Sequence, residues 1–425
     1  MNITELYQIF LKHPQPQTDT RNLKTGDIFF ALKGPNFNAN TFAEQALEKG
    51  AAYVVADEML FPENDRIILV DDVLITLQML AKHHREQFRI PFIAITGSNG
   101  KTTTKELVHT VLSTTYKCYT TKGNLNNHIG IPLTILAVAK DAEMAVIEMG
   151  ANHLREIAGY CEYTMPTHGI ITNCGKAHLE GFGGIEGVRK GKGELYDYLR
   201  SHNGSAFVMW DYDYLRDMSK GIPEVITYGT HDASLTGHAQ PKSTFLSVLF
   251  ETGLSIVKTD TQLVGDYNLP NVLVAATIGK YFGVNEEKIR ASIESYSPSN
   301  SRSQLIKKDG AEIILDAYNA NPSSMRAAIE NFAGIPGNGK ILILGAMAEL
   351  GPDSVAEHQG IVDLIDAYKW SNVVLVGGDF MNIKTSYVTV PAATDAKKWL
   401  KTQDLAGKTL LVKGSRSMKM EDTLK

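Results

Sequence analysis

Cysteine is scarce in this sequence of 425 residues, which contains only Cys118, Cys161 and Cys174. The three are scattered, and none stands in a Cys-x-x-Cys pair. The pattern therefore indicates neither a zinc site nor a disulfide framework. It is typical of reduced thiols in the cytoplasm, where we expect this protein to reside.

Long apolar runs and excess positive charge are also missing. No stretch approaches the roughly 20 apolar residues that span a bilayer. The first residues, MNITELYQIFLKHPQ, do not join a basic region to an apolar core as a secretory signal does. A formal net charge of −5 argues against a dedicated nucleic-acid binder, which is usually basic. With 43% hydrophobic and 21% charged residues, the composition is that of a soluble globular protein.

The length predicts two or three domains, because one hydrophobic core rarely serves 425 residues. Strand-like and helical stretches alternate along the chain, which predicts an α/β fold with a parallel, doubly wound central sheet. We expect a small α/β domain at residues 1–89, a central domain at 90–300 and a Rossmann-like domain at 301–425. The Ser/Pro/Asn-rich stretch ESYSPSNSRSQ is typical of a linker and marks the second boundary.

The expected strands are short apolar runs that end at glycines or polar turns. In the first domain they are AYVVAD and RIILVDD, accompanied by the helical patterns TFAEQALEKGA and LITLQMLAKHHREQF. In the central domain they are PFIAITG, MAVIEMG, HGIITNCG, SAFVMW and EVITYG. In the third domain they are EIILDAY, KILILGAM, NVVLVGG and TLLVKGS.

The stretch ITGSNGKTTTKE, residues 95–106, has the setting of a phosphate-binding loop, because it follows an apolar strand and opens a helical pattern. Four residues usually separate the first Gly from the Gly-Lys pair, whereas only two separate Gly97 from Gly100. Backbone N–H groups at a helix start bind phosphate oxygens. Lys101 would neutralise phosphate charge, and the Thr102 hydroxyl would bind Mg²⁺. The alternative is a glycine-rich turn with a solvated Lys, but the full combination favours a P-loop ATPase-like domain.

TGSNGKTTTKE resembles the ATP loop of the Mur ligase family, the ATP-dependent amide ligases of peptidoglycan synthesis. The ending Thr-Lys-Glu is similar to that of the members that add D-alanyl-D-alanine. Further segments carry the resemblance: KGNLNNHIGIPLT, IEMGA, ITNCGKAHLEGFGG, GVRKGKGELYDYL, GDYNLPNVLVAA and LDAYNANPSSMRAA. The resemblance implies ATP contacts at Gly97, Ser98, Asn99, Gly100, Lys101, Thr102, Thr103, Asn271, Arg302 and Asp316.

The resemblance also implies a magnesium site. Glu148 ends an apolar strand, and Asn173 and His178 follow the next one, at the edge where parallel sheets bind ligands. A hard carboxylate suits Mg²⁺, although a lone Glu or His in such a place is also typical of a structural residue. In the family, the Lys that matches Lys192 is carbamylated by CO₂, which requires a neutral amine. The implied metal set is Thr102, Glu148, His178 and carbamylated Lys192, and the implied catalytic set is Lys101, Lys192, His178 and Arg302.

Substrate contacts are implied at both ends of the chain. For the UDP-linked substrate they are Thr20, Arg21, Lys33, Asn124, Asn126 and Asn127, and for the acceptor they are Tyr318, Asn319, Asn321 and Arg416. The Asn-rich run is costly to bury without partners and so favours a ligand-facing loop, with a polar turn before a helix as the alternative. Three places depart from the family pattern: Tyr267 replaces a His, Ala346 replaces an Asp, and Asn38-Ala39-Asn40 replaces Asp-Gly-His.

The implied reaction joins two small molecules at the expense of ATP. ATP would convert the terminal carboxylate of UDP-N-acetylmuramoyl-tripeptide into an acyl phosphate, which the amine of D-alanyl-D-alanine would attack. We expect a monomer that uses ATP and Mg²⁺ and closes its third domain over the cleft. One alternative is a sister ligase with another acceptor, including the folylpolyglutamate type, which the TTTKE and YNANPSSM segments disfavour. The other is a binding module that hydrolyses ATP without ligation, which gives no reason for the Glu148, His178 and Lys192 set.

Overall fold

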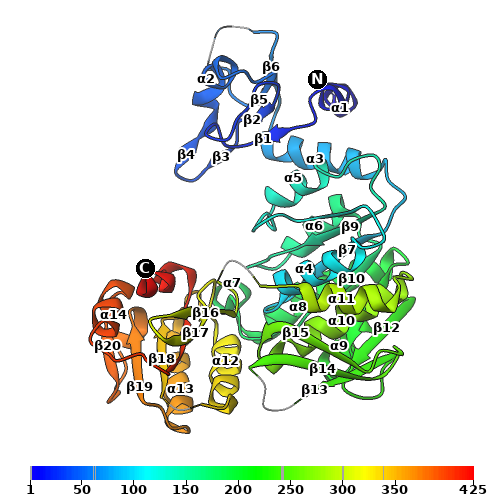
Figure 1. Cartoon of the computed structure of the whole chain (residues 1–425). Coiled ribbons are helices and arrows are strands. Elements are labelled where there is room, and N and C mark those ends of the chain that lie inside the picture. The colour runs from blue at the N-terminus through cyan, green and yellow to red at the C-terminus, as the bar shows by residue number, and fades with distance from the viewer. Residues whose placement is uncertain (1, 61, 63, 241–243, 299–300, 338) are drawn as a thin grey trace.

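The computed structural model describes residues 2–60, 62, 64–240, 244–298, 301–337 and 339–425. Its β-strands form three main sheets in three successive parts of the chain, each with helices packed against it (Figure 1). The predicted α/β class, with a parallel central sheet and a Rossmann-like third part, is confirmed. The domain boundaries stay predictions, and residues 299 and 300 of the expected linker lie outside the described residues.

The N-terminal part has a four-stranded parallel sheet of order β1-β2-β5-β6 and a small hairpin, β3-β4. Its strands are β1 (Pro16–Gln17), β2 (Ile28–Phe30), β3 (Lys33–Gly34), β4 (Phe37–Asn38), β5 (Tyr53–Ala56) and β6 (Ile67–Leu69). Its helices are α1 (Ile3–Lys12), the 3₁₀ turn η1 (Ala39–Phe42), α2 (Ala43–Glu48) and α3 (Val73–Arg85). The helix predicted over TFAEQALEKGA is shorter than expected, because its first residues belong to the 3₁₀ turn.

Helix α3 belongs to the first domain in the sequence prediction but packs on the central part (Figure 1). His84 Nε2 lies 2.8 Å from the carbonyl oxygen of Val138. Arg85 donates to the carbonyl oxygens of Thr164 and Met165 at 2.9 and 2.8 Å. These contacts between buried groups anchor the helix that leads out of the N-terminal part.

The central part is a nine-stranded sheet of order β15-β14-β13-β12-β11-β10-β7-β9-β8. Its strands are β7 (Phe92–Thr96), β8 (Cys118–Thr120), β9 (Met144–Glu148), β10 (His168–Ile171), β11 (Ser205–Met209), β12 (Glu224–Gly229), β13 (Leu235–Ala239), β14 (Phe245–Thr252) and β15 (Lys258–Val264). Its helices are α4 (Lys101–Leu112), α5 (Gly130–Leu136), α6 (Glu156–Thr164), α7 (Leu179–Phe182), α8 (Ile185–Ser201), α9 (Asp213–Ser219), η2 (Asp266–Asn268), α10 (Leu269–Tyr281) and α11 (Glu286–Ser295).

One edge of this sheet is antiparallel, which the sequence analysis did not predict. Strands β13, β14 and β15 form antiparallel pairs, whereas every other pair in the sheet is parallel. Burial along β15 alternates between exposed and buried residues, as in a strand with one face in water. The described residues between these strands contain no helix, so the alternation of strands and helices used to predict parallel strands does not apply to this region.

The third part is a six-stranded sheet of order β16-β17-β21-β18-β19-β20, with only β16 and β17 antiparallel. Its strands are β16 (Gln304–Lys308), β17 (Ala311–Asp316), β18 (Lys340–Gly345), β19 (Asn372–Val376), β20 (Val388–Val390) and β21 (Thr409–Lys413). Its helices are α12 (Pro322–Gly334), η3 (Gly351–Asp353), α13 (Ser354–Asp366), η4 (Gly378–Met381), α14 (Ala393–Leu400), η5 (Arg416–Met418) and η6 (Met420–Leu424).

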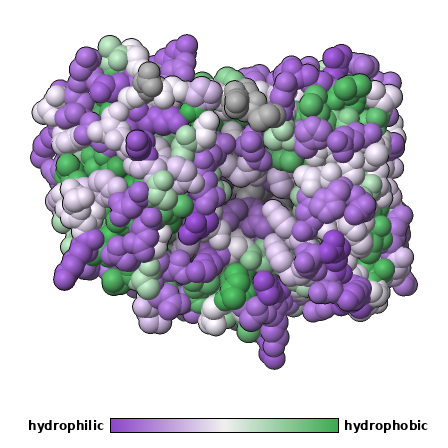
Figure 2. All heavy atoms as spheres, turned by 90° about the horizontal axis from the view of Figure 1, so that it is seen from below, coloured by the Kyte–Doolittle hydropathy of each residue, from purple (hydrophilic) through white to green (hydrophobic). Residues whose placement is uncertain are grey.

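The N-terminal part and the third part lie on different sides of the central part (Figure 1). The N-terminal part lies beyond α3. The third part lies beside the central sheet, and α7 and α12 lie where the third part faces the central part (Figure 1). Seen from the side opposite the N-terminal part, the surface is hollowed between two lobes, and hydrophilic residues gather in the hollow (Figure 2). Within the described residues, no helix has the length and apolar character needed to cross a membrane.

Candidate active site

The loop between β7 and α4 has a shape that only glycine permits at two positions. Gly97 has a φ of 140°, and a Cβ placed there would lie 2.0 Å from Thr172 Oγ1. Gly100 has a φ of 81°, and its Cβ would lie 2.7 Å from Asn271 Oδ1. Side chains other than hydrogen disfavour this left-handed backbone. Both positions in the short Gly-x-x-Gly motif therefore require glycine, because Thr172 and Asn271 lie too close to the loop for a Cβ.

Residues after β10 brace the loop from one side. The Ser98 N–H donates to the Asn173 carbonyl oxygen at 2.9 Å, and the Asn99 N–H donates to Asn173 Oδ1 at 3.1 Å. Thr172 Oγ1 donates to the Asn99 carbonyl oxygen at 2.6 Å, and Ser98 Oγ donates to that of Gly175 at 2.8 Å. The sequence analysis located Asn173 at this edge without giving it a role. Its position directly after a buried strand was the available signal.

Lys101 folds back over the loop. Its Nζ donates to the carbonyl oxygens of Gly97 at 2.7 Å and Ser98 at 3.2 Å. Burial lowers the pKa of Lys101, while the carboxylate of Glu148 acts in the opposite direction. The ammonium group thus sits inside the curve of backbone that would surround a phosphate. Thr103 lies half-buried in the first turn of α4.

Glu148 is the strongest candidate for a metal ligand. It ends β9 opposite Ile95 of β7 and is only 1% exposed. Its Oε1 accepts hydrogen bonds from Thr102 Oγ1 at 3.1 Å and Asn126 Nδ2 at 2.7 Å. Its Oε2 is buried and has no hydrogen-bond partner among the described residues. A buried carboxylate oxygen without a partner is costly, and a hard cation such as Mg²⁺ would satisfy it. Thr102 and Glu148 therefore fit a magnesium site.

Lys192 is buried in α8 and has little to stabilise a charge. It is 1% exposed, its Nζ donates to the Ala151 carbonyl oxygen at 2.9 Å, and it lies 5.0 Å from the centre of the Phe182 ring. Burial, followed by the positive charge of Lys101, lowers the pKa of Lys192 to about 7. The lowered pKa of Lys192 favours the neutral amine, which is the form that reacts with CO₂.

His178 lies against the third part of the chain. Its Nδ1 forms a hydrogen bond with Glu349 Oε2, and this contact lowers the pKa of the Glu349 carboxyl. In the part of the chain that the structure describes, no group of three or more His, Cys, Asp or Glu side chains is arranged to hold a metal ion. The structure thus brings Thr102 and Glu148 into contact but does not gather His178 into a carboxylate and imidazole cluster with them.

The predicted nucleotide residues beyond the loop are engaged within the protein. Asn271 Nδ2 donates to Asn268 Oδ1 at 2.9 Å, and its Oδ1 accepts from Thr104 Oγ1 at 3.0 Å. The Arg302 guanidinium lies 3.5 Å from the centre of the Tyr318 ring. Asp316 accepts a hydrogen bond from Lys413 Nζ at 2.6 Å.

The Lys413 to Asp316 ion pair was missed by the sequence analysis. Lys413 is 2% exposed, and its Nζ also donates to the Asn319 carbonyl oxygen at 3.3 Å. The Ser303 N–H reaches the other carboxylate oxygen of Asp316 at 3.2 Å. The sequence indicated only a Lys at the end of an apolar strand. Its partner, Asp316, is identified by the pairing of β17 with β21, which the sequence pattern does not specify.

One predicted acceptor residue reaches the phosphate loop. Asn321 caps α12, and its Nδ2 donates to Asn99 Oδ1 at 2.8 Å, which joins the third part to the loop. Arg416 instead forms an ion pair with Glu421 at 2.7 Å and is mostly exposed. The structure therefore brings Asn321 to the nucleotide edge and directs Arg416 toward its own segment.

The predicted UDP-substrate residues fall into two groups. Arg21 pairs with Asp19 at 2.7 Å, Lys33 pairs with Asp57 and Glu58, each at 3.2 Å, and the Thr20 carbonyl oxygen accepts from Lys49. These residues lie in the N-terminal part, away from the loop (Figure 1).

In the Asn-rich group, Asn126 is partly buried beside Glu148, whereas Asn124 and Asn127 are exposed. Asn126 contacts Glu148, and Asn127 Oδ1 accepts from the N–H groups of Ile129 and Gly130 at the start of α5. The carbonyl oxygen of Asn124 accepts from the Asn126 N–H at 2.8 Å.

The residues that depart from the family pattern are packed or hydrogen-bonded within the protein. Ala346 is buried, and a Cβ added at Gly378 would lie 2.5 Å from its methyl group. Tyr267 is hydrogen-bonded to Ser303 Oγ at 2.8 Å. Asn38 Nδ2 donates to Glu58 at 2.7 Å, and Asn40 Nδ2 donates to Asp57 at 2.8 Å.

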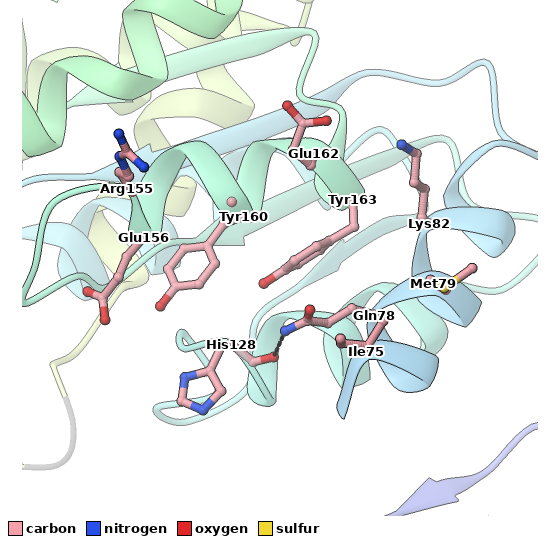
Figure 3. A pocket seen from close by; sticks show the side chains of 11 residues that line it. Ile75, Gln78, Met79, Lys82, His128, Arg155, Glu156, Tyr160, Glu162 and Tyr163 are labelled. Atoms are coloured by element: carbon pink, nitrogen blue, oxygen red, sulfur yellow. Dashed lines mark hydrogen bonds between the residues drawn. The ribbon is translucent and has the colours of Figure 1, made fainter. Parts of the chain in front are cut away.

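A cavity of about 460 Å³ lies between α3 and α6, away from the phosphate loop (Figure 3). Its lining consists of Ile75, Gln78, Met79, Lys82, His128, Arg155, Glu156, Gly159, Tyr160, Glu162 and Tyr163. No predicted site residue lines it. The hydrogen bond from Gln78 Nε2 to the His128 carbonyl oxygen, 3.1 Å long, joins α3 to the loop before α5 at the rim of this cavity. The loop and its braces, rather than cavity size, define the candidate active site.

Comparison with known proteins agrees with this geometry along the whole chain. The family described as "Mur ligase middle domain" matches residues 95–279, and "Mur ligase, glutamate ligase domain" matches residues 301–416. The UDP-N-acetylmuramoyl-tripeptide–D-alanyl-D-alanine ligase of Bacillus subtilis is 34% identical, with 100% of this chain and 97% of that protein aligned. The Escherichia coli enzyme of the same name is 35% identical over 96% of this chain and 92% of its own length.

Solved structures give the same result. MurF from Acinetobacter baumannii superposes with a TM-score of 0.89 at 28% identity, covering 100% of this chain and 97% of that one. MurF from Thermotoga maritima, in complex with ADP, has a TM-score of 0.88 at 27% identity, covering 97% of both chains. The phosphate loop, its neighbouring carboxylate and these full-length similarities together establish that the chain belongs to the Mur ligase family.

Proposed function

We propose that this protein is an ATP-dependent amide ligase that joins D-alanyl-D-alanine to UDP-N-acetylmuramoyl-tripeptide, forming the pentapeptide precursor of peptidoglycan. The observation that carries the proposal is the similarity to enzymes of that name over the whole chain, including the N-terminal part and the third part. The nucleotide geometry at Gly97–Thr102 and Glu148 supports the use of ATP.

The first half-reaction activates a carboxylate. An oxygen of the tripeptide carboxylate attacks the γ-phosphorus of ATP, so that an acyl phosphate forms and ADP leaves. Loop N–H groups and Lys101 contact the phosphates, and Lys101 exchanges its two carbonyl contacts for phosphate oxygens. Mg²⁺ would be held by Thr102 and Glu148 and, when bound, would offset the charge on the phosphates. Arg302 would add a further positive charge on the transferring group.

The second half-reaction forms the amide. The neutral amine of D-alanyl-D-alanine attacks the acyl carbonyl, and inorganic phosphate leaves. Water would compete for the acyl phosphate, so the acceptor must be held over the cleft while water is excluded. The contact of Asn321 with Asn99 supports a role for the third part in covering the loop. Tyr318 and Asn319 are adjacent on the same loop and are proposed to face the acceptor.

The test is phosphate release in the presence of ATP, Mg²⁺, UDP-N-acetylmuramoyl-tripeptide and D-alanyl-D-alanine, with each component omitted in turn. We expect release only from the complete mixture, together with a pentapeptide product identified by mass. Release without the dipeptide would favour a hydrolysing module. Release with a different amine would favour a sister ligase. Tripeptides with lysine and with diaminopimelate at the third position are compared in the same assay.

A further inference from the structure

Glu148 is held by its backbone as well as by its side chain. The Glu148 N–H donates to Thr121 Oγ1 at 2.9 Å, in the segment that follows β8. On the other side, Thr96 Oγ1, at the end of β7, donates to the Met149 carbonyl oxygen at 2.8 Å. Both threonines are buried. Since β9 lies between β7 and β8, a hydroxyl from each side fixes the point at which β9 ends.

The hydroxyl of Thr121 occupies a place that a backbone carbonyl would take in a longer strand. The Thr121 N–H donates to the Val146 carbonyl oxygen at 3.2 Å, as in a parallel ladder. If that ladder continued, the Glu148 N–H would donate to the Thr121 carbonyl oxygen. That carbonyl oxygen instead accepts from Lys105 Nζ at 2.8 Å. The side chain of Thr121 therefore extends the pairing of β9 beyond the end of β8.

Lys105 is a buried cation to which the proposed reaction gives no role. It belongs to the Thr-Lys-Glu ending of the loop motif and is 2% exposed. Its ion pair with Glu106 is loose, at 3.7 Å, and the other Glu106 oxygen accepts from the Tyr296 hydroxyl at 2.6 Å. Among the described residues, the Thr121 carbonyl oxygen is the only hydrogen-bond acceptor of its Nζ. A buried ammonium is costly without such a partner, so Lys105 and Thr121 hold each other in place.

These contacts bear on the carboxylate oxygen that is open to a cation. Glu148 Oε1 accepts from Thr102 and Asn126, whereas Oε2 is buried without a hydrogen-bond partner among the described residues. The direction of Oε2 depends on where the Glu148 backbone lies, and Thr121 fixes that backbone. Groups that hold a metal-binding carboxylate in place without touching the metal are a regular part of metal sites.

We propose that Thr121 is a positioning residue for Glu148, supported by Lys105, so that Glu148 Oε2 is presented to the cation that accompanies the nucleotide. The proposal rests on the proposed function, because that function makes Glu148 a Mg²⁺ ligand. Thr102 and Lys105 are three residues apart and so share one face of α4. The helix that begins at the phosphate loop therefore acts on Glu148 twice, through its carboxylate and through its backbone.

The experiment measures Mn²⁺ binding to the full-length protein in the presence of ADP, by the electron paramagnetic resonance signal of free Mn²⁺. Thr121→Val keeps the shape of the side chain but cannot accept from the Glu148 N–H, and it is expected to weaken Mn²⁺ binding by about tenfold. Thr121→Ser keeps the acceptor and should restore most of the affinity. Lys105→Met removes the support but leaves every hydroxyl in place, and should fall between Thr121→Val and the wild type. ADP affinity without metal is measured alongside and is expected to change by less than about twofold.

Thr120→Val is the matched control, because the Thr120 hydroxyl donates to the Val146 carbonyl oxygen on the same strand and not to Glu148. It is expected to change Mn²⁺ affinity by less than about twofold. Equal weakening by Thr120→Val and Thr121→Val would overturn the proposal in favour of a general loosening of β8. A loss in Thr121→Ser as large as that in Thr121→Val would also overturn it, because the hydroxyl would then not be the group that matters.

Glu148→Gln separates this proposal from the proposed function. If Glu148→Gln weakens Mn²⁺ binding and neither Thr121→Val nor Lys105→Met does, only the positioning role fails. If Glu148→Gln has no effect, the metal role of Glu148 fails as well. Unchanged Mn²⁺ affinity in Lys105→Met alone would remove Lys105 from the support and leave the role to the Thr121 hydroxyl.

Discussion

At the scale of single residues, the site contains a few positions at which the surrounding atoms allow only one type of side chain. Gly97 is the clearest case, because its backbone conformation and the closeness of Thr172 both exclude a Cβ. Glu148 is the second, because one carboxylate oxygen is satisfied by Thr102 and Asn126 and the other is left for a cation. A buried polar atom without a hydrogen-bond partner therefore identifies a candidate ligand site more specifically than the size of a cavity does.

We predict that Gly97→Ala weakens ADP binding at least tenfold, equivalent to about 1.4 kcal/mol. The added methyl group would overlap Thr172 Oγ1 and force the loop out of its shape. Isothermal titration calorimetry of ADP measures the effect. Gly159→Ala is the control, since a Cβ there meets no atom within 4 Å. Unchanged ADP affinity in Gly97→Ala would show that the loop tolerates a different path.

A second prediction concerns acid stability. Burial lowers the pKa of His168 from its ordinary 6.5 to about 4. Between these values the unfolded chain binds the proton and the folded chain does not, so stability falls as pH decreases from 6.5 to 4, by at most about 3 kcal/mol. In His168→Phe, whose ring retains the contacts with Phe207 and Phe282, the melting temperature should fall less between pH 6.5 and 4.5 than in the wild type. Parallel falls in the two proteins would contradict the prediction.

Residue identities in the site were predictable to the extent that they lie in one continuous motif. Gly97, Gly100, Lys101 and Thr102 could be chosen because strand, turn and helix are adjacent in sequence. Glu148 could be chosen because it ends a strand. The partner of Asp316 could not, because Lys413 is 97 residues away and meets it only through strand pairing. The contact of His178 with Glu349 was equally beyond reach, because it depends on how two domains dock.

At the scale of elements, the short buried strands were the elements that could be predicted best from the sequence. The apolar runs expected as β7, β9, β10, β17 and β21 form strands, the first three in the central sheet and the last two in the sheet of the third part. The antiparallel edge of the central sheet was missed, because pairing direction depends on partners that the local pattern does not specify. Helix ends were less accurate than strands, as the 3₁₀ turn before α2 illustrates.

Helix α6 offers a test of local helix energetics away from the loop. Gly159 lies within it, is exposed and has space for a Cβ. Gly159→Ala should stabilise the protein by about 0.5–1 kcal/mol, because Ala loses less backbone freedom on folding. Calorimetry should therefore give a melting transition about 1–4 °C higher. A lower melting temperature would mean that the cavity wall beside Tyr160 and Tyr163 requires a bare backbone.

At the scale of the whole molecule, the nucleotide edge is built by the central part and completed by the third. The central sheet supplies the loop, its braces and Glu148. The third part adds Asn321 beside Asn99 and Glu349 beside His178. The way in which these two parts dock therefore determines which residues lie at the nucleotide edge. The sequence pattern does not predict this docking geometry.

The ion pair of Lys176 with Glu357 should contribute to that docking. Lys176→Glu and Glu357→Lys each place like charges together and should favour more open arrangements, by up to about 1 kcal/mol for a pair that is partly exposed. The combined exchange restores opposite charges and should restore the wild-type arrangement. Small-angle X-ray scattering in the absence of nucleotide checks this through the radius of gyration. If the double variant is as expanded as the single variants, the pair does not act through its charge.

The split between the two parts also has a consequence for protein synthesis. Every residue that shapes and braces the loop, from Phe92 to Asn271, emerges from the ribosome before the third part, and domains generally fold as units in that order. A nascent chain that ends at Pro298 already contains a glycine loop, a lysine and a carboxylate suited to a nucleotide. It lacks Arg302, Asp316 and Asn321, so any nucleotide captured at that stage would stabilise the growing enzyme without being consumed.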